Sequence, residues 1–323
     1  ESIVNILITN VNFIASVELI KCLKRITKTA ITIIGTGEEP QEYSYGGGMV
    51  DIFLQTPCKN SIELYFAFIK DVLKSYNIDL VISVSDSELK YLTDICSELN
   101  THFICSNKET IGLFQDKLGA SIEISKLPLV SIPPILESLI GANKVIFRKR
   151  NSVGSKGIYI VDLNEEQYIK NLFTKEYFIQ EYIEGTEYTV DVFADKLGQP
   201  KIIIPRKRIE IRNGISYRCQ IHYNKDVIKS CKTIYNAFKI PGLSNVQFIV
   251  QNKTVYFIEL NLRFAGTGIA GILASFNYIA EYLDHFINNT ELYDYEYYMN
   301  KVAWDSIITK CYDERIYYPT NLN

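Results

Sequence analysis

Polar residues interrupt two neighbouring apolar runs late in the sequence, and together they indicate a metal site. The runs read VQFIV and VYFIEL and are separated by a short turn, so they predict a β-hairpin. Side chains alternate between the two faces of a strand, which puts Glu259 and Asn261 on one face, with Gln247 able to face them from the partner strand. Three converging oxygen donors suit a hard cation such as Mg²⁺, which leaves coordination positions for phosphate oxygens. Arg263 shares this face, and a purely structural role is disfavoured because unpaired buried charge is costly.

A basic strand end followed by a loop rich in Gly and Ser is expected to bind phosphate. Arg148 ends an apolar run, and the loop after it contains Ser152, Gly154, Ser155 and Gly157. Backbone N–H groups of such a loop form an anion-binding concavity, and neighbouring cations add charge-assisted hydrogen bonds to phosphate oxygens. Taken alone, this segment is better explained as a solvated hairpin with surface Lys and Arg, because basic hairpins are common.

An extended segment between two expected strands is suited to a nucleoside. It contains Gln180, Glu181, Tyr182 and Ile183, whose backbone donors and acceptors can read an adenine edge while apolar neighbours hold the ring. Glu187 begins the next strand and is placed to accept hydrogen bonds from ribose hydroxyls. The alternative is a two-stranded corner with solvated acids.

A third basic segment lies on or beside a later strand. Strand alternation puts Arg206 and Arg208 on one face and Lys207 on the other. Two guanidinium groups on one face can hold a phosphoryl group or a carboxylate. An edge strand protected by charge is an alternative of similar weight.

Composition limits the class of protein. The chain has 323 residues, enough for two domains, and its 47% apolar and 22% charged residues exclude a disordered or fibrous chain. A net charge of −3 disfavours non-specific nucleic-acid binding. No stretch approaches the ~20 apolar residues of a membrane span, and no basic, cleavable leader opens the sequence. We therefore expect a cytoplasmic protein that binds neither nucleic acid nor membrane.

Cysteine and histidine offer no obvious site. The 7 Cys are scattered, and the 3 His have no partner four residues away. Any metal is therefore expected to be bound by oxygen.

The first hundred residues alternate β-branched runs with amphipathic segments, which predicts a parallel sheet with helices on both faces. The expected strands are Ile3–Thr9, Ala30–Gly35, Val50–Leu54, Leu80–Val84 and His102–Cys105, and the expected helices are Phe13–Ile26, Ser61–Tyr76 and Ser87–Leu99. The turn Thr9–Phe13 contains no glycine, so a dinucleotide-dependent oxidoreductase is disfavoured although the architecture is Rossmann-like.

The remainder predicts an α+β part. A connecting helix is expected at Asn107–Gly119, followed by a proline-rich boundary at Leu127–Pro134. The expected antiparallel strands are Val145–Arg148, Gly157–Val161, Tyr177–Tyr182, Glu187–Ala194, Lys201–Ile209, Ser244–Val250 and Thr254–Leu260. Helices are expected at Glu165–Phe173, at Lys225–Phe238 and after Gly268, with Tyr293–Tyr298 as a packed edge. Substrate specificity is expected from the loops Gly35–Gly48 and Arg212–Tyr223.

Taken in this order, the polar segments resemble the motifs of the ATP-grasp superfamily and, more narrowly, of the branch similar to the large subunit of carbamoyl-phosphate synthase. The resemblance implies a Rossmann-like preATP-grasp domain over residues 1–107, a small ATP-grasp subdomain over 108–183, and a large subdomain with a C-terminal helical tail over 184–323. It adds Lys117, which matches the family's Asp-Lys or Asp-Arg motif, as a nucleotide-phosphate contact. Leu262 and Lys149 stand where most members have proline.

The same resemblance implies a carbon–nitrogen ligase that uses ATP and Mg²⁺, with Mn²⁺ as an alternative ion. In such enzymes a carboxylate attacks the γ-phosphate to give an acylphosphate and ADP, and an amine or other nucleophile then displaces phosphate. The implied metal ligands are Gln247, Glu259 and Asn261, and the implied contacts to the acylphosphate are Arg206, Arg208 and Arg263. The expected partners are ATP and small-molecule carboxylate and amine substrates, and a homodimer is left open.

Other activities are less compatible with the sequence. Biotin carboxylase is disfavoured because the family's Gln-Val-Glu-His continuation is missing after Arg263, and full carbamoyl-phosphate synthesis because the chain has room for one ATP-grasp unit. The competing class is a regulatory or structural nucleotide-binding module without ligase turnover. The nearly complete set of metal ligands argues against that class.

Overall fold

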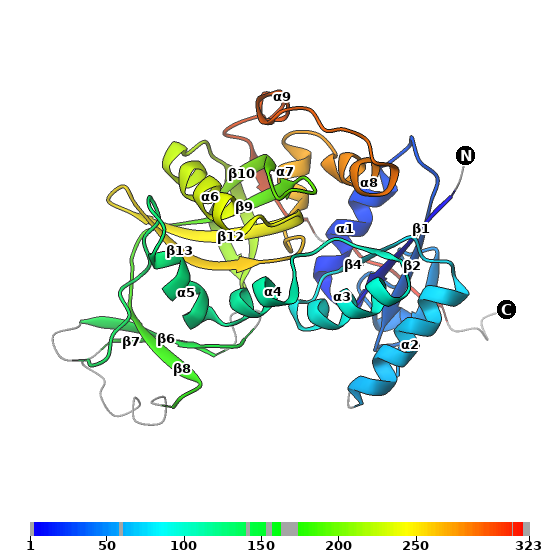
Figure 1. Cartoon of the computed structure of the whole chain (residues 1–323), viewed down its shortest axis with the longest axis horizontal. Coiled ribbons are helices and arrows are strands. Elements are labelled where there is room, and N and C mark those ends of the chain that lie inside the picture. The colour runs from blue at the N-terminus through cyan, green and yellow to red at the C-terminus, as the bar shows by residue number, and fades with distance from the viewer. Residues whose placement is uncertain are drawn as a thin grey trace.

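The computed structural model describes residues 3–57, 61–139, 143–152, 157–162, 174–311 and 313–318. Three sheets organise these residues, as Figure 1 shows: a parallel sheet in the blue and cyan first hundred residues, a large antiparallel sheet in green and yellow, and a small green sheet beside it. Each sheet falls within one of the three predicted segments, whose boundaries stay a prediction. In the described part of the chain, no helix is both long and apolar enough to cross a membrane.

The first sheet is parallel and has five strands, as the sequence predicts, and their order is β3-β2-β1-β4-β5. Its strands are β1 (Val4–Thr9), β2 (Ile31–Gly37), β3 (Ile52–Gln55), β4 (Leu80–Ser83) and β5 (His102–Phe103). The helices α1 (Ile14–Lys24), α2 (Ile62–Ser75) and α3 (Leu89–Glu98) connect them, with the short helices η1 (Gln41–Tyr43) and η2 (Asp86–Glu88). Residues that follow β1 and β4, such as Asn12 and Ser85, line a cavity together with residues of the antiparallel sheets, and open α/β sheets bind ligands at the carboxyl ends of their strands.

The predicted connecting helix at 107–119 is wrong in one respect, because two helices occupy this segment: α4 (Lys108–Gln115) and α5 (Lys117–Ser125). Asp116 separates them with an extended backbone, and its side chain accepts a hydrogen bond from the backbone N–H of Leu118. Asp116 therefore acts as the N-cap of α5. The break places Lys117 at the first position of the new helix.

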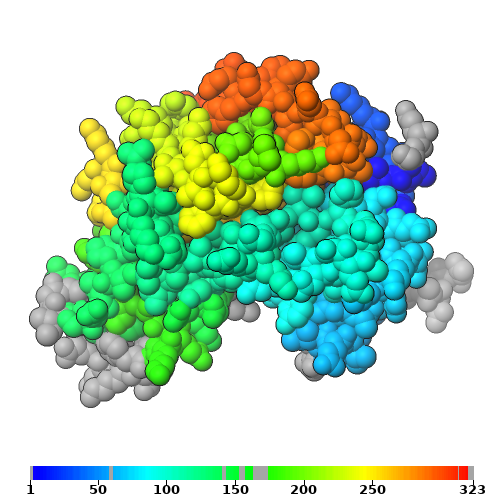
Figure 2. Space-filling view, in the orientation of Figure 1, coloured from blue at the N-terminus to red at the C-terminus, as the bar shows by residue number. Residues whose placement is uncertain are grey.

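The small sheet is antiparallel, with order β7-β6-β8, and comprises β6 (Lys144–Lys149), β7 (Ile158–Asp162) and β8 (Tyr177–Glu181). The proline-rich segment before it makes an isolated bridge to each antiparallel sheet, from Ser131 to Tyr256 and from Ile135 to Gln180. The helix predicted at 165–173 lies outside the described residues. We call the part that carries the parallel sheet the first domain. In Figure 2 the molecular surface is indented between the green segment that carries the small sheet and the cyan helices of the first domain.

The large sheet has six antiparallel strands in the order β13-β12-β9-β10-β11-β14. They are β9 (Thr186–Ala194), β10 (Pro200–Arg212), β11 (Ile215–Ile221), β12 (Gly242–Gln251), β13 (Thr254–Asn261) and β14 (Ile307–Thr309). One face is apolar and packs in a common core with α4, α5 and α6 (Lys225–Phe238). On the other face, strand alternation groups Thr189, Asp191, Asn245 and Gln247, so this sheet presents a polar surface inside the molecule.

One part of the large sheet differs from the sequence-based expectation. The segment 212–223, expected as a loop, is mostly strand β11, which pairs with β10 through a two-residue turn at Asn213 and Gly214. Both turn residues have positive φ, +50° and +77°, as a type I′ hairpin turn requires. The Asn-Gly pair was the signal in the sequence that would have revealed this hairpin.

The C-terminal region contains more helices than the single one expected after Gly268. The structure has α7 (Ile269–Leu273), α8 (Tyr278–Asn288) and α9 (Tyr295–Met299). The tyrosine-rich stretch is only partly a packed edge, because Tyr298 is buried whereas Tyr293 and Tyr297 are exposed. Helices α1, α7 and α8 share one apolar core with the first sheet and the large sheet, which joins the two halves of the molecule.

Candidate functional site

A cavity of about 600 Å³ lies between the small and large sheets and extends to the first domain. Residues of both antiparallel sheets line it. The start of α1 and the turn that follows β4 also contribute lining residues. A second cavity of about 310 Å³ adjoins it. The residues that line both cavities are Asp86, Ser87, Lys117, Ser152, Glu259 and Asn261.

Part of the lining of the larger cavity is apolar, and we call this part the apolar slot. Ile146 and Ile158 line it from the small sheet, and Ile249 and Ile258 line it from the large sheet. The segment 180–183, proposed from the sequence as an adenine-binding hinge, lines the same cavity. The slot is therefore suited to a flat apolar ring whose edge meets backbone groups.

A β-bulge contributes to this slot. Gln247 pairs with Glu259 and Phe248 pairs with Phe257, so Ile258 has no partner in the register between β12 and β13. A bulge breaks strand alternation locally and re-aims side chains. As a result, the consecutive residues Ile258 and Glu259 both line the cavity, one in the apolar slot and one in the polar region.

Arg148 and Lys117 form the cationic part of the site. The Arg148 side chain donates to the Gln180 Oε1 atom at 3.1 Å and to the Ile258 carbonyl oxygen at 2.9 Å. Lys117 donates to the Ser152 carbonyl oxygen and to its hydroxyl at 3.3 Å, and its Nζ atom lies 3.9 Å from the Glu259 Oε2 atom. Burial lowers the pKa of both Arg148 and Lys117, while Glu259 opposes that effect at each. Both cations are thus held mostly by neutral oxygens.

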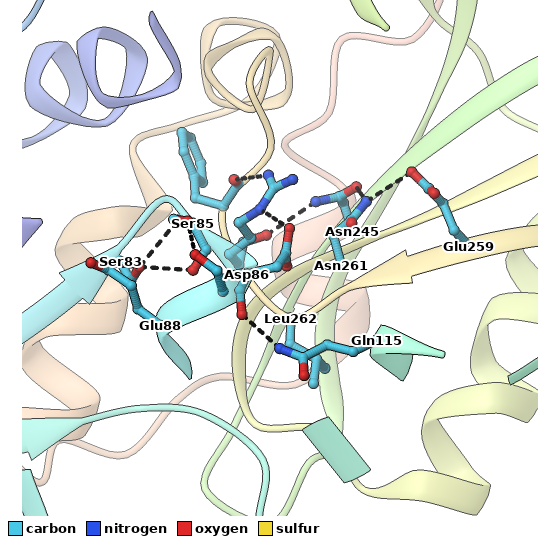
Figure 3. Close-up of polar contacts among 12 residues, drawn as sticks. Ser83, Ser85, Asp86, Glu88, Gln115, Asn245, Glu259, Asn261 and Leu262 are labelled. Atoms are coloured by element: carbon cyan, nitrogen blue, oxygen red, sulfur yellow. Dashed lines mark hydrogen bonds and ion pairs between the residues drawn. The ribbon is translucent and has the colours of Figure 1, made fainter. Parts of the chain in front are cut away.

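The oxygen donors predicted to hold a metal meet as expected on the polar face. Gln247 stands directly opposite Glu259, and Asn245 stands opposite Asn261. The Asn245 Nδ2 group donates to the Arg263 carbonyl oxygen at 3.0 Å, which leaves the Asn245 Oδ1 atom to accept from the Asn261 Nδ2 group at 3.2 Å. Figure 3 shows these contacts. Since the amide nitrogen of Asn261 is engaged, its oxygen is turned toward other partners.

This donor set fits Mg²⁺ bound together with a nucleotide. Glu259 supplies one carboxylate and Gln247 and Asn261 supply amide oxygens, and Mg²⁺ is commonly held by one or two carboxylates plus substrate phosphates. Within the described residues there is no cluster of three or more His, Cys, Asp or Glu side chains. The set is therefore poorly suited to holding a metal without added anions.

Arg263 lies on the same polar face but is tied to the first domain. Its Nε group donates to the Asp86 Oδ2 atom at 2.7 Å, and its Nη1 group donates to the Phe264 carbonyl oxygen at 3.3 Å. Asp86 belongs to η2, directly after β4. Figure 3 shows Asp86 between Gln115 and the pair Asn245 and Asn261.

Arg206 and Arg208 share a face of β10, as the sequence predicts, but both are already engaged. Arg206 is 1% exposed and binds Asp191 through its Nε and Nη2 groups at 2.6 and 3.1 Å. Arg208 donates to the Gly214 carbonyl oxygen at 2.7 Å and to Glu187 at 3.2 Å, and only Arg206 lines the cavity. The carboxylate predicted for ribose, Glu187, is therefore paired with Arg208, and neither residue is among the cavity-lining residues.

The predicted phosphate loop is described in part. Ser152 lines both cavities and contacts Lys117, and Gly157 has a φ of +71° at the start of β7. Gly154 and Ser155 lie outside the described residues. Two residues of the site were missed from the sequence: Asn245, which the strand alternation of Gln247 already placed on the polar face, and Asp86, for which no local pattern gave a signal.

Comparison with known proteins agrees with this geometry. A family model described as ATP-grasp in the biosynthetic pathway with Ter operon matches residues 173–304. The chain is 28% identical over 236 residues to tyramine–L-glutamate ligase of Methanocaldococcus jannaschii, covering 69% of this chain and 68% of that protein. It is 25% identical over 277 residues to the carbamoyl phosphate synthase large chain of Clostridium beijerinckii, covering 77% of this chain but only 25% of that protein.

A solved structure with the same fold is the biotin carboxylase domain of 2-oxoglutarate carboxylase from Hydrogenobacter thermophilus, a dimer in complex with MgADP, ADP and bicarbonate. Its TM-score is 0.69 at 17% identity, and the match covers 94% of this chain and 73% of that chain. At this identity the likeness shows the fold alone. The chain is therefore similar to the ATP-grasp family over residues 173–304, and over most of its length to a ligase and to the large chain of carbamoyl phosphate synthase.

Proposed function

We propose that this protein activates a small-molecule carboxylate with ATP and joins it to an amine. The observation that supports this proposal is the lining of one cavity, which combines apolar side chains of both antiparallel sheets, the cations Lys117 and Arg148, and the oxygen donors around Glu259. These groups suit the base, the phosphates and a phosphate-bound metal of one nucleotide. No protein nucleophile is required, because positioning and charge neutralisation carry phosphoryl transfer.

The reaction balances in two steps. A carboxylate oxygen of the substrate attacks the γ-phosphorus of ATP, the bond to the bridging oxygen breaks, and ADP leaves. The amine then attacks the carbonyl carbon of the acylphosphate, phosphate leaves, and the amine loses a proton to solvent or phosphate. An amide or a similar carbon–nitrogen bond results.

The residues take distinct roles in this proposal. The segment 180–183 and the isoleucines of the slot hold the adenine, and Lys117, Arg148 and Ser152 bind phosphate oxygens. Gln247, Glu259 and Asn261 would hold Mg²⁺, which supplies Lewis-acid polarisation of the phosphoryl group when bound. Arg263 neutralises the charge of the transferred group. Arg206 lines the same cavity, and its own charge is paired with Asp191.

The substrate class is narrower than the fold alone implies. The relative that is matched over 68% of its own length is named as a ligase of an amine to an amino acid, tyramine to L-glutamate. We extend this class, an amine with an amino acid or comparable carboxylate, to the present chain. The use of Mn²⁺ in place of Mg²⁺ and assembly as a homodimer stay predictions.

The test is a screen for ADP release over paired carboxylates and amines with MgATP, followed by Glu259→Ala on the active pair. We expect Glu259→Ala to lower turnover by roughly 10²-fold or more, because it removes the single carboxylate of the proposed metal site. Glu176→Gln is the matched control, since Glu176 is exposed and pairs with Lys149 away from the cavity. Unchanged ADP formation in Glu259→Ala would refute the metal assignment. Nucleotide binding without ADP release on any pair would favour a non-catalytic module.

A further inference from the structure

The Arg263 guanidinium has hydrogen-bond partners at two of its three nitrogens. Its Nε group is bound by Asp86 and its Nη1 group by the Phe264 carbonyl oxygen, whereas Nη2 has no hydrogen-bond partner within the described part of the chain. The Arg263 side chain is 19% exposed and lines the larger cavity. Asp86 and the Phe264 carbonyl oxygen therefore hold the guanidinium at Nε and Nη1, and the Nη2 group is left to donate to a ligand.

Asp86 is itself rigidly placed, because the turn that carries it is anchored on several sides. Its backbone carbonyl oxygen accepts from the Gln115 side chain at 2.6 Å. Two residues later, the buried Glu88 carboxylate accepts from Thr9 at 2.8 Å, from Ser83 at 2.9 Å and from the Tyr65 hydroxyl. Burial and the Glu88 charge raise the pKa of Tyr65, which keeps this phenol protonated and donating. The turn is thus tied to β1, β4, α2 and α4.

A continuous series of contacts leads from Asp86 to the oxygen donors of the proposed metal site. Asp86 binds the Arg263 side chain, the Arg263 carbonyl oxygen binds Asn245, and Asn245 binds Asn261, whose Nδ2 group lies 3.4 Å from the Glu259 Oε1 atom. Figure 3 shows this series from the first-domain turn to β13. Asp86 of the first domain therefore contacts Arg263, which follows β13 and is the residue expected to meet the transferred phosphate.

We propose that Asp86 is a positioning residue for phosphoryl transfer, which orients the Arg263 guanidinium toward the γ-phosphate without touching the substrate. This inference rests on the proposed function. A guanidinium whose direction is fixed before binding loses less freedom when it meets its ligand, and preorganised charge of this kind favours the transition state.

The experiment is a double-mutant cycle read by calorimetry. The probes are MgADP and the magnesium complex of a non-hydrolysable ATP analogue with an imido group between the β- and γ-phosphorus. The proteins are the wild type, Asp86→Ala, Asp86→Asn, Arg263→Ala, the double variant Asp86→Ala with Arg263→Ala, and Asp94→Asn. Asp94 pairs with Lys108 on the exposed surface, so its variant controls for loss of an acid as such.

We expect Arg263→Ala and Asp86→Ala each to weaken binding of the analogue about tenfold, the loss typical of a hydrogen bond to a charged group. Binding of MgADP should be nearly unchanged. Asp86→Asn should lose less than Asp86→Ala, because its amide oxygen still accepts from Nε, and it serves if the alanine variant unfolds. In the Arg263→Ala background, Asp86→Ala should cause no further loss, because it acts through Arg263.

Each other outcome has a defined meaning. If Arg263→Ala weakens binding of the ATP analogue and Asp86→Ala does not, the positioning role of Asp86 is refuted while the proposed function stands. An equal loss of affinity for MgADP and for the analogue in Asp86→Ala would show a general structural role and refute the positioning role. Additive losses of affinity in the double variant would do the same. If Arg263→Ala itself leaves both affinities unchanged, the phosphate role of Arg263 in the proposed function fails.

Discussion

At the scale of single residues, the positive charges of the buried cations in the cavity are only partly balanced by nearby carboxylates. Arg148 is 2% exposed and is held by the Gln180 side chain and a backbone carbonyl oxygen, both neutral. Lys117 is also buried, and the nearest carboxylate oxygen, of Glu259, lies 3.9 Å from its Nζ atom. A buried charge without a close counter-ion is costly. These two residues are therefore prepared for an anionic ligand, whose binding recovers part of that cost.

The pH dependence of nucleotide binding follows from Lys117. Burial lowers the pKa of this lysine, so its charge is lost at a lower pH than that of an ordinary lysine. Phosphate binding needs the ammonium form, and we therefore expect the dissociation constant for MgADP to rise as the pH increases through the lowered pKa. The measurement is calorimetric titration at a series of pH values between about 7 and 10.

Lys117→Arg is the matched variant, because a guanidinium keeps its charge throughout that range. Its affinity for MgADP should stay constant where that of the wild type falls, even if its absolute affinity is lower. An identical alkaline loss in both proteins would show that another group causes it.

At the scale of elements, strand alternation was sufficient to locate much of the site. The hairpin of β12 and β13 could be predicted from its apolar runs, and the same alternation correctly placed Gln247 opposite Glu259. The bulge at Ile258 could not be predicted, because it depends on register against β12 rather than on the local sequence. The engagement of Arg206 by Asp191 was also out of reach, since it arises from the pairing of β9 with β10.

The hairpin of β10 and β11 supplies a prediction at this scale. Gly214 has a φ of +77° in the two-residue turn, its carbonyl oxygen accepts from Arg208, and the turn lines the cavity. A Cβ atom in the left-handed region costs about 1 kcal/mol. Gly214→Ala should therefore lower the free energy of unfolding by about that amount, measured by chemical denaturation.

Gly266→Ala is the control, because a Cβ atom there meets only Ile215 at 3.9 Å and Ala15 at 4.0 Å, which is ordinary contact. Its stability should stay close to that of the wild type. Equal stability of the two variants would contradict the assignment of a strained turn at Gly214.

At the scale of the whole molecule, contacts between distant segments join the part that carries the parallel sheet to the rest of the chain. Asp86 and Arg263 are 177 positions apart, and Glu18 and Lys310 are 292 positions apart. Helix α1 also shares the apolar core that contains α7 and α8. A single sequence, read without aligned relatives, carries no information about such long-range pairings. For this reason Asp86 was missed, although its neighbours in space were identified.

The pair of Glu18 and Lys310 gives the last prediction. The Lys310 Nζ atom lies 2.7 Å from the Glu18 Oε1 atom and 3.1 Å from the Gly266 carbonyl oxygen, and the two side chains are only 13% and 9% exposed. Removal of one partner leaves the other charge buried, which costs roughly 3 kcal/mol. Glu18→Gln and Lys310→Met should each show a loss of this size in the free energy of unfolding.

The double variant Glu18→Gln with Lys310→Met distinguishes a buried pair from general damage. It leaves no uncompensated charge, so it should be less destabilised than the sum of the two single variants. Asp94→Asn, which breaks the exposed pair with Lys108, should cost less than about 1 kcal/mol and calibrates the denaturation measurement. Additive losses in the double variant, or single losses no larger than that of Asp94→Asn, would show that this pair does not hold the C-terminal strand against the first domain.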